Sequence, residues 1–380
     1  MTARLVDGTV RKLGIEEELL LADVATGELR PVSREVIAAC APSPGSEDGV
    51  QIKHEFFLSQ VEVASSPRAE VGAIRDELTG ARERIAVAGA EWGVVPLAVP
   101  GPVLARAAER QDDFSPGERY AEIDRHYGDV ARRSLMCALH VHVEVADDEE
   151  GVAVIDRLRP WIPVLLAISA NSPYWEGRDS GYASWRSRVW NLWPTGGPGE
   201  LFGDAATYHA VADDMVRRGA ALDLAMVNLD VRLSHRYPTV EFRMADVCTD
   251  IDDALLVAAL ARALVTHAAS RWRAGDPPEP WRVDELRAAA WRAARFGLSD
   301  TLVSPESRVL TDAGEVLEQL VAMLTEPLER AGDLGLVARG LAVLQARGNG
   351  ASRQRAAFAE TGDLSGVVAD LGARTLTSSA

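Results

Sequence analysis

The sequence predicts an α+β protein whose main sheet is largely antiparallel and carries helices on one side only. Several segments alternate apolar and polar residues, which is typical of strands that bury one face and leave the other open. Other segments repeat apolar residues at the 3.6-residue period of amphipathic helices, and these dominate the C-terminal part. With 380 residues, of which 47% are hydrophobic, the chain can bury one large core.

The first predicted strand covers residues 13–21. Successive side chains of a strand point to opposite faces, so Glu16 and Glu18 share one face and Glu17 falls among apolar residues on the other. The two carboxylates of the shared face lie about 7 Å apart along the strand. In a partly buried site they would repel each other, and a hard divalent cation such as Mg²⁺ or Mn²⁺ would relieve that repulsion.

Four further strands are predicted, and three of them, at 56–65, 135–145 and 239–247, carry side chains that suit the same site. The fourth covers residues 224–234. The polar faces of the three include Glu62, His140, His142, Glu241 and Arg243. If all the strands share one sheet, these side chains converge on its open face and predict a metal site. The alternative is that each strand exposes a polar face to water, although such faces are seldom so rich in Glu and His.

Arg243 has two open interpretations. Its guanidinium would clamp a transferring phosphoryl group beside the metal, or it would form an ion pair with the neighbouring Glu241.

The helix predictions rest on apolar periodicity. They cover residues 69–91, 151–169, 252–273, 283–296, 313–331 and 334–346. Residues 43–49 are predicted to form an exposed turn, and the tail from 353 to 380 carries only a weak pattern.

Composition excludes several function classes. The formal net charge of −17 argues against a nucleic-acid or membrane-surface partner, because both need a clustered basic footprint. No apolar run approaches the roughly 20 residues of a membrane span, and we expect no signal peptide. The three cysteines are too scattered for a disulfide framework, which favours a cytoplasmic location. Lys12 and Lys53 are the only lysines, and no P-loop is present, so ATP phosphates would be held by metals and arginines.

The connection from 171 to 200 is far longer than the usual 4–6 residues. Its aromatic residues are Tyr174, Trp175, Tyr182, Trp185, Trp190 and Trp193. Its arginines are Arg178, Arg186 and Arg188. Aromatic and basic content in a long connection is typical of a binding loop or a lid.

Several segments resemble the glutamate–cysteine ligase family. They are GIEEELLL at 14–21, HEFFLSQVEVASSP at 54–67, LHVHVEV at 139–145 and TVEFRMADVC at 239–248. NSPYWEGRDSGYASWR, from residue 171, and WRAARFGL, at 291–298, look like the short bacterial branch, often labelled carboxylate–amine ligase. The landmarks extend in the family's order from about residue 11 to residue 300.

The resemblance implies a catalytic fold related to glutamine synthetase, in which a curved antiparallel sheet forms a funnel with helices outside. Residues 1–300 would form the ATP- and metal-binding ligase domain, and residues 301–380 a helical portion packed on the same domain. The implied metal ligands are Glu16, Glu18, Glu55, Glu62, His140 and Glu241. Glu55 and Glu62 have opposite strand parity, so both reach the metal only if a bulge or turn separates them.

The remaining candidate site residues complete this implied picture. His142 and Arg243 would face the phosphates of ATP or of an acyl phosphate, and Arg295 is a further candidate for contact with the nucleotide. From the chemistry of the long connection, Tyr182, Arg186 and Arg178 are candidates for substrate binding.

The implied reaction is the ATP-dependent joining of a carboxylate to an amine through an acyl phosphate, with Mg²⁺ or Mn²⁺. The favoured substrates are L-glutamate, through its γ-carboxyl group, and L-cysteine. Alternatives are a ligase for another acid or amine, a guanidino-kinase-like phosphotransferase, a metal-independent glycosidase with paired carboxylates, and a nucleotide-binding protein without turnover. The oligomeric state, including a homo-oligomer, stays open.

Overall fold

A computed structural model describes residues 9–40, 49–106 and 113–377. The turn predicted at 43–49 lies, except for Gly49, outside the described residues.

The centre of the molecule is an antiparallel sheet. Its strands are β1 (Leu13–Asp23), β2 (Gln51–His54), β3 (Gln60–Ala64), β4 (Val94–Leu97), β5 (Ala138–Glu144), β8 (Val231–Leu233) and β9 (Thr239–Asp246). Within the described residues the order is β2-β3-β1-β5-β9-β8, and β4 also pairs with β1. Every pairing is antiparallel, as the alternation predicted. Two short hairpins lie apart from it, β6 (Tyr174–Trp175) with β7 (Arg178–Asp179) and β10 (Thr301–Val303) with β11 (Leu310–Asp312).

The helices before the middle of the chain are α1 (Ser33–Ala39), α2 (Val71–Ala90), α3 (Glu118–Tyr127), α4 (Asp129–Arg132), α5 (Asp148–Leu158), α6 (Ile162–Ser169) and α7 (Arg186–Trp190). The later ones are α8 (Ala205–Arg217), α9 (Ile251–Arg273), α10 (Val283–Phe296), α11 (Ala313–Ala331), α12 (Leu334–Arg347), α13 (Gly350–Thr361) and α14 (Leu364–Leu376).

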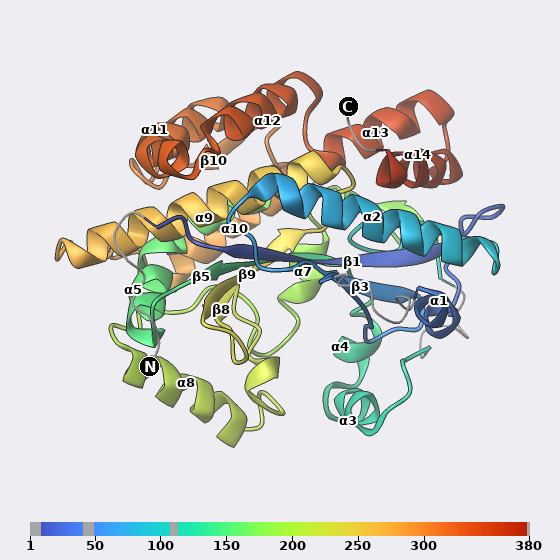
Figure 1. The fold of residues 1–380 in the computed structure, drawn as a ribbon, viewed down its shortest axis with the longest axis horizontal. Helices are drawn as coiled ribbons and strands as arrows, with labels where there is room; N and C mark the ends of the chain where they lie inside the picture. The colour runs from blue at the N-terminus through green and yellow to red at the C-terminus, as the bar shows by residue number, and fades with distance from the viewer. Residues whose placement is uncertain (1–8, 41–48, 107–112, 378–380) are drawn as a thin grey trace.

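The helices are distributed unevenly over the two sides of the sheet (Figure 1). The long helices α2 and α9 lie along one face, and α11 to α14 form a further layer beyond them (Figure 1). On the opposite side, α8 and the pair α3–α4 stand at the two ends of the sheet (Figure 1). The predicted α+β architecture, an antiparallel sheet with helices on its outer face, is therefore confirmed. The prediction that helices lie on one side only is wrong, because α8 and α3–α4 lie on the other side.

The C-terminal helices pack on the same core as the sheet. Helices α11 and α12 contact α9, and α14 contacts α2 and β4. A domain boundary at residue 300 stays a prediction.

Three segments differ from the sequence predictions. The helix predicted at 151–169 is α5 and α6 joined by a 3₁₀ turn at Arg159–Trp161, because Pro160 and Pro163 lack the amide hydrogen that a continuous helix needs. The strand predicted at 224–234 is a 3₁₀ turn capped by Asp223, followed by the short β8. The weakly patterned tail forms α13 and α14.

Glu17, to which the sequence assigned no role, forms a buried ion pair behind the open face. Its Oε1 and Oε2 accept hydrogen bonds from Arg82 Nε and Nη2, at 2.9 and 2.6 Å. The two side chains are only 0% and 1% exposed. Arg82 also donates to the backbone oxygens of Cys248, Thr249 and Thr375. One guanidinium therefore joins β1 and α2 to the start of α9 and to α14.

Replacing Arg82 should therefore destabilise the whole fold. We expect Arg82→Met to lower the free energy of unfolding by about 3–5 kcal/mol, since it leaves a buried carboxylate without its partner. The double variant Glu17→Leu with Arg82→Met should recover much of that loss. Urea denaturation measures both. Arg218→Met removes an exposed ion pair with Asp214 and is the control, with an expected loss below about 1 kcal/mol. A similar small loss for Arg82→Met would contradict this role.

A second buried network fixes the entry to β1. Arg11 Nη1 and Nη2 donate to the two carboxylate oxygens of Glu150 at 3.0 and 2.9 Å, and Arg273 also pairs with this group. The amide of Ala146 donates to Glu150 Oε2 at 2.7 Å. Burial alone would raise the pKa of Glu150, but the hydrogen bonds and charge of Arg11 outweigh it, so the pKa is lowered.

The lowered pKa gives a prediction for acid stability. The unfolded chain binds a proton at Glu150 more readily than the folded chain, so this stabilisation is complete above the ordinary pKa of 4.5 and is lost as the pH falls through the lowered folded value. Glu150→Gln should therefore destabilise the protein most at neutral pH, and its difference from the wild type should shrink as the pH falls below 4.5. Urea denaturation across that range tests this, and a difference that is constant with pH would refute it.

Candidate active site

The register of the sheet brings the predicted ligands together. Glu16 on β1 lies opposite His140 on β5, and Glu18 lies opposite Glu62 on β3. His142 in turn lies opposite Glu241 on β9. The polar residues of four neighbouring strands thus share one face, as the sequence predicted on condition of a common sheet. This face is less open than the sequence predicted, because His140 and Glu241 are only 5% and 2% exposed.

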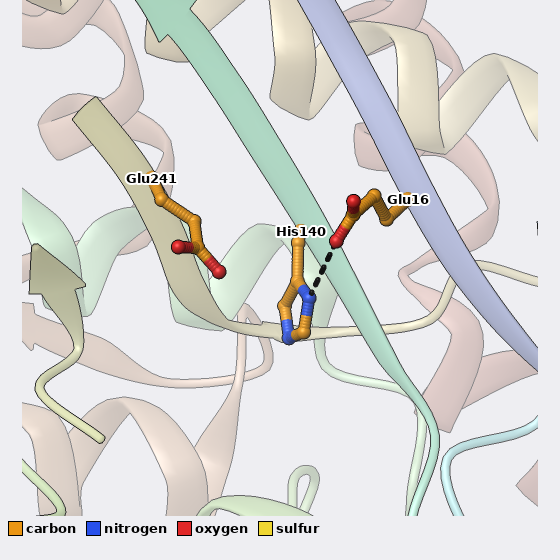
Figure 2. Close-up of side chains that lie close together, drawn as sticks. All are labelled: Glu16, His140 and Glu241. Carbon is orange, nitrogen blue, oxygen red and sulfur yellow. Dashed lines mark ion pairs between the residues drawn. The ribbon is translucent and has the colours of Figure 1, made fainter. Parts of the chain in front are cut away.

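Glu16, His140 and Glu241 form the tightest group. One ligand atom from each lies within 4.8 Å of the other two. Figure 2 shows the three side chains reaching into one space from β1, β5 and β9. His140 Nδ1 lies 3.5 Å from Glu16 Oε2. Two carboxylates and one imidazole at this spacing match the donor set that a divalent cation uses.

Both histidines of β5 keep one ring nitrogen unsatisfied. His142 Nδ1 forms a 2.9 Å hydrogen bond with Thr239 Oγ1, and its Nε2 lies 3.7 Å from Glu16 Oε2. Within the described residues, Nε2 of His140 and Nε2 of His142 are buried without a hydrogen-bond partner. Buried polar atoms are usually paired, so two unpaired imidazole nitrogens beside carboxylates indicate a site for a metal or for phosphate oxygens.

Glu18, Glu55 and Glu62 form an adjoining acidic group. Burial, assisted by the charge of Glu62, raises the pKa of Glu18 to about 7, although the Ala138 amide donates a hydrogen bond to its carboxylate. Burial, together with Glu18 and Glu62, raises the pKa of Glu55 well above its ordinary value. The pKa of Glu62 is raised by burial and by Glu16, although Lys53 Nζ lies 3.1 Å away. Burial and mutual repulsion make these carboxylates costly to ionise, and a bound cation would lower that cost.

The turn that allows both Glu55 and Glu62 to reach one site is present. Glu55 follows β2, and residues 55–59 leave the strand conformation before β3 begins. The strand parity of Glu55 therefore does not carry over to Glu62, and both carboxylates approach Glu18.

The pKa values of Glu16 and Glu241 are lowered, whereas those of the acidic group are raised. Burial would raise the pKa of Glu16, but the close contacts with the imidazoles of His140 and His142 lower it. Burial would also raise the pKa of Glu241, whereas Arg243 and Arg232 lower it. Burial and then Arg243 lower the pKa of His140 to about 4. The imidazole is therefore neutral at physiological pH, which is the form that binds metals.

Arg232 is a site residue that the sequence did not single out. Its Nε donates to Glu241 Oε2 at 2.8 Å, and its Nη1 donates to the backbone oxygens of Ala225 and Val227. Only the polar face of the predicted strand 224–234 hinted at it, because its partner could not be known before the register of β8 and β9.

Arg243 forms an ion pair with Glu241, which was one of its two interpretations. It lies at a β-bulge, where Leu139 pairs with Ala245 but Val141 pairs with Phe242, so β9 carries one extra residue. Its Nε is buried without a hydrogen-bond partner in the described chain. Contact of this guanidinium with a phosphoryl group stays a prediction.

Arg186 supports the bulge. Its Nη2 and Nη1 donate to the backbone oxygens of Arg243 and Met244, at 3.0 and 3.1 Å. The side chain is 0% exposed, and Asp246 lies 3.7 Å away. The observed contacts of Arg186 are therefore with β9, and its predicted contact with a substrate stays a prediction.

The other candidates lie apart from the carboxylates. The hydroxyl group of Tyr182 accepts a 3.2 Å hydrogen bond from Trp291 Nε1, and the guanidinium of Arg295 lies 5.5 Å from the Tyr182 ring. Arg178 is exposed on β7. Among the described residues, no hydrogen bond or ion pair joins Tyr182, Arg178 or Arg295 to the metal-site carboxylates. Their roles in substrate or nucleotide binding stay predictions.

A cavity of about 490 Å³ opens beside the site. Its lining includes Glu16, His142 and Tyr237, and also Lys12 and Lys53, the two lysines of the chain. It therefore joins metal-site side chains to two ammonium groups.

The comparison with models of protein families shows to which family the chain belongs. The model of the glutamate–cysteine ligase family 2 (GCS2) matches residues 12–370. The chain belongs to this family. The resemblance predicted from the strand motifs is thereby confirmed, and so is the ligase class.

Curated relatives match this family member over nearly its whole length. A protein from Streptomyces coelicolor that carries the provisional name glutamate–cysteine ligase 2 is 46% identical over 366 residues, covering 96% of this chain and 99% of its own. A protein from Rhodopirellula baltica with the same provisional name is 37% identical, covering 97% and 98%.

Solved structures share the fold of this family member. The glutamate–cysteine ligase of Francisella tularensis, in complex with AMP, gives a TM-score of 0.68 at 10% identity, covering 97% of this chain and 89% of its own. The bifunctional glutathione synthetase of Pasteurella multocida gives 0.66 at 15% identity, covering 96% and 51%. The ligase PafA, in complex with Pup, gives 0.55 at 12% identity, covering 92% and 68%.

Among the described helices, none combines the length and the apolar character that crossing a membrane requires.

The clustered ligands predict a measurable metal site. We expect Glu16→Gln to weaken Mn²⁺ binding at least about tenfold, because it removes a charged donor between His140 and the acidic group. Calorimetric titration without nucleotide measures this. Glu144→Gln is the matched control, since this carboxylate lies further along β5 and accepts a hydrogen bond from the Lys12 amide instead. Equal losses in the two variants would contradict the assignment.

Proposed function

We propose that this family member uses ATP to activate the γ-carboxyl group of L-glutamate and joins it to the amine of L-cysteine. The observation that carries the proposal is the convergence of Glu16, His140 and Glu241, with the acidic group beside them, on the open face of a sheet shared with glutamate–cysteine ligases. Among the functions considered from the sequence, this site best suits phosphoryl transfer to a carboxylate.

The carboxylates and the neutral His140 would hold Mg²⁺ or Mn²⁺. Bound there, such ions would neutralise phosphate charge and align the γ-phosphate with the attacking carboxylate. Six side chains are candidates for this role, namely Glu16, Glu18, Glu55, Glu62, His140 and Glu241.

The cavity beside Glu16 is our candidate for the nucleotide. Lys12 and Lys53 line it, and their charges suit a polyphosphate in a chain of net charge −17. His142, which reaches both the cavity and Glu16, has its free Nε2 at the junction where the γ-phosphate would lie.

Arg243 would act on the acyl phosphate. The guanidinium has one buried nitrogen without a partner, and Trp190 packs against it, with the guanidinium carbon 5.3 Å from the ring centroid. A fixed positive charge stabilises the phosphate that departs when the amine attacks. Because Arg186 bonds to the backbone of the bulge, Arg243 is held in place before the substrates bind.

ATP turnover tests the reaction directly. Purified protein with Mg²⁺ and L-glutamate should release ADP when L-cysteine is added, with γ-glutamylcysteine formed in equal amount. ADP release with a different acid or amine would retain the ligase and replace the substrates. ADP release that needs no carboxylate would favour a phosphotransferase. No stimulation by any acid–amine pair would overturn the proposal.

Arg243→Gln should separate catalysis from folding. We expect it to lower kcat by about 10²–10³-fold with a smaller change in the KM for ATP, because the charge acts most strongly in the transition state. Steady-state kinetics measure both constants. Arg218→Gln, on the exposed side of α8, is the control and should leave them unchanged. A rise of that size in the KM for ATP, with kcat unchanged, would show instead that Arg243 acts in ATP binding.

A further inference from the structure

A separate cavity lies at the outer edge of β9. Strand β8 pairs only with the first half of β9, because the segment before it forms a 3₁₀ turn instead of a longer strand. Residues of α6, α7 and α10 surround the space beside this edge, which has a volume of about 300 Å³. We call it the edge pocket and define it by Ile162, Leu166, Arg188, Trp190, Asp230 and Arg287. Neither Glu16, His140 nor Glu241 lines it.

Asp230 brings an unpaired carboxylate to the edge pocket. Its backbone is fixed, because its amide donates to Gly197 and its carbonyl oxygen accepts from the Arg243 amide at 2.8 Å. In the part of the chain that the structure describes, its carboxylate has no hydrogen bond or ion pair. Burial raises its pKa to about 6, and the charges of Arg188 and Arg186 oppose this rise. A cationic group of a ligand would satisfy this carboxylate.

Two arginines bring positive charge to the same cavity. The side chain of Arg188 makes one hydrogen bond in the described chain, from Nε to Ser187 Oγ at 3.2 Å, so its terminal nitrogens stay available. Burial lowers the pKa of Arg188, and the like charge of Arg287 contributes to the decrease. Arg287 itself is exposed at the rim on α10. Two neighbouring guanidinium groups with like charges suit an anionic ligand group such as a carboxylate.

The edge pocket continues into a narrow recess with a third arginine. The recess, of about 20 Å³, shares Asp230 and Ile162 with the edge pocket, and Arg159 lines it. Arg159 is only 6% exposed, yet its Nε and Nη1 have no hydrogen-bond partner in the described chain. Its Nη2 donates to the Trp281 backbone oxygen at 2.6 Å. Two buried donors without partners are still costly, so this arrangement indicates a polar ligand or ordered water.

Most of the remaining lining is apolar, and Ser187 and Asn191 are its polar members. Ile162 and Leu166 of α6 face Met244 of β9, and Ala288 and Ala290 of α10 complete the wall. The volume lies at the lower end of the range for small-molecule sites, which suits a compact molecule. Apolar walls with a few convergent charges of both signs are the composition of a site for a small zwitterion.

We propose that the edge pocket binds a small α-amino acid, with its carboxylate on Arg188 and Arg287 and its ammonium group on Asp230. A compact apolar side chain fits between Ile162 and Leu166. The site is separate from the metal centre and needs neither metal nor ATP. Trp190 forms the partition, since its ring lines the edge pocket and packs against Arg243, which pairs with Glu241 on the other side.

Calorimetric titration of the metal-free and nucleotide-free full chain tests the proposal. The probes are the proteinogenic L-amino acids, followed by the carboxylate-only and amine-only analogues of any that binds. We expect saturable binding of at least one small apolar amino acid, and at least about tenfold weaker binding of both analogues, because each loses one charged contact. Absence of saturable binding for every amino acid, or equal binding of an analogue, would overturn the proposal.

Variants locate the ligand. Asp230→Asn and Arg188→Gln should each weaken the binding of the same amino acid at least about tenfold, with an unchanged circular dichroism spectrum. Glu16→Gln removes a metal-site carboxylate and should leave this binding unchanged. Unchanged affinity in both edge-pocket variants would overturn the proposal, as would loss of binding in Glu16→Gln. Because the analogue comparison uses the wild-type protein, it decides the question even if a variant does not fold.

Discussion

Repulsion among carboxylates is the constraint on which the site depends. The register of β1 with β3 and β5 places Glu18 opposite Glu62 and Glu16 opposite His140, and the turn after β2 adds Glu55. Such a cluster persists only because the rest of the fold is rigid behind it. The apolar face of β1, the buried Glu17–Arg82 pair and the layer of α2 and α9 provide that rigidity.

Positive charge is distributed unevenly around this cluster. Arg232 and Arg243 lower the pKa of Glu241, whereas the acidic group around Glu18 has Lys53 and more distant arginines, and its pKa values rise. Two kinds of carboxylate therefore meet on one face, some ionised in advance and others ionised when a cation binds. That combination allows a metal site to form without leaving an uncompensated charge in its absence.

Alternation and motif order were enough to predict the antiparallel sheet, the long helices and the shared face of Glu16, Glu18, Glu62, His140 and Glu241. Alternation also revealed that Glu55 needed a turn. The bulge in β9 was not predictable, because it reflects the pairing of β5 with β9 and not the composition of either strand. Arg82 and Arg232 were missed for the same reason, since the partner of Arg82 is 65 residues away and that of Arg232 lies across the β8–β9 register.

The contact between Arg82 and Thr375 also constrains the order in which this chain can fold. Thr375 lies 293 residues beyond Arg82, yet its backbone oxygen accepts a hydrogen bond from the guanidinium that pairs with Glu17 on β1. Long-range contacts of this kind form late, both in refolding and during synthesis from the N-terminus. The packing around the strand that carries Glu16 and Glu18 is therefore completed only after the segment up to Thr375 has been synthesised.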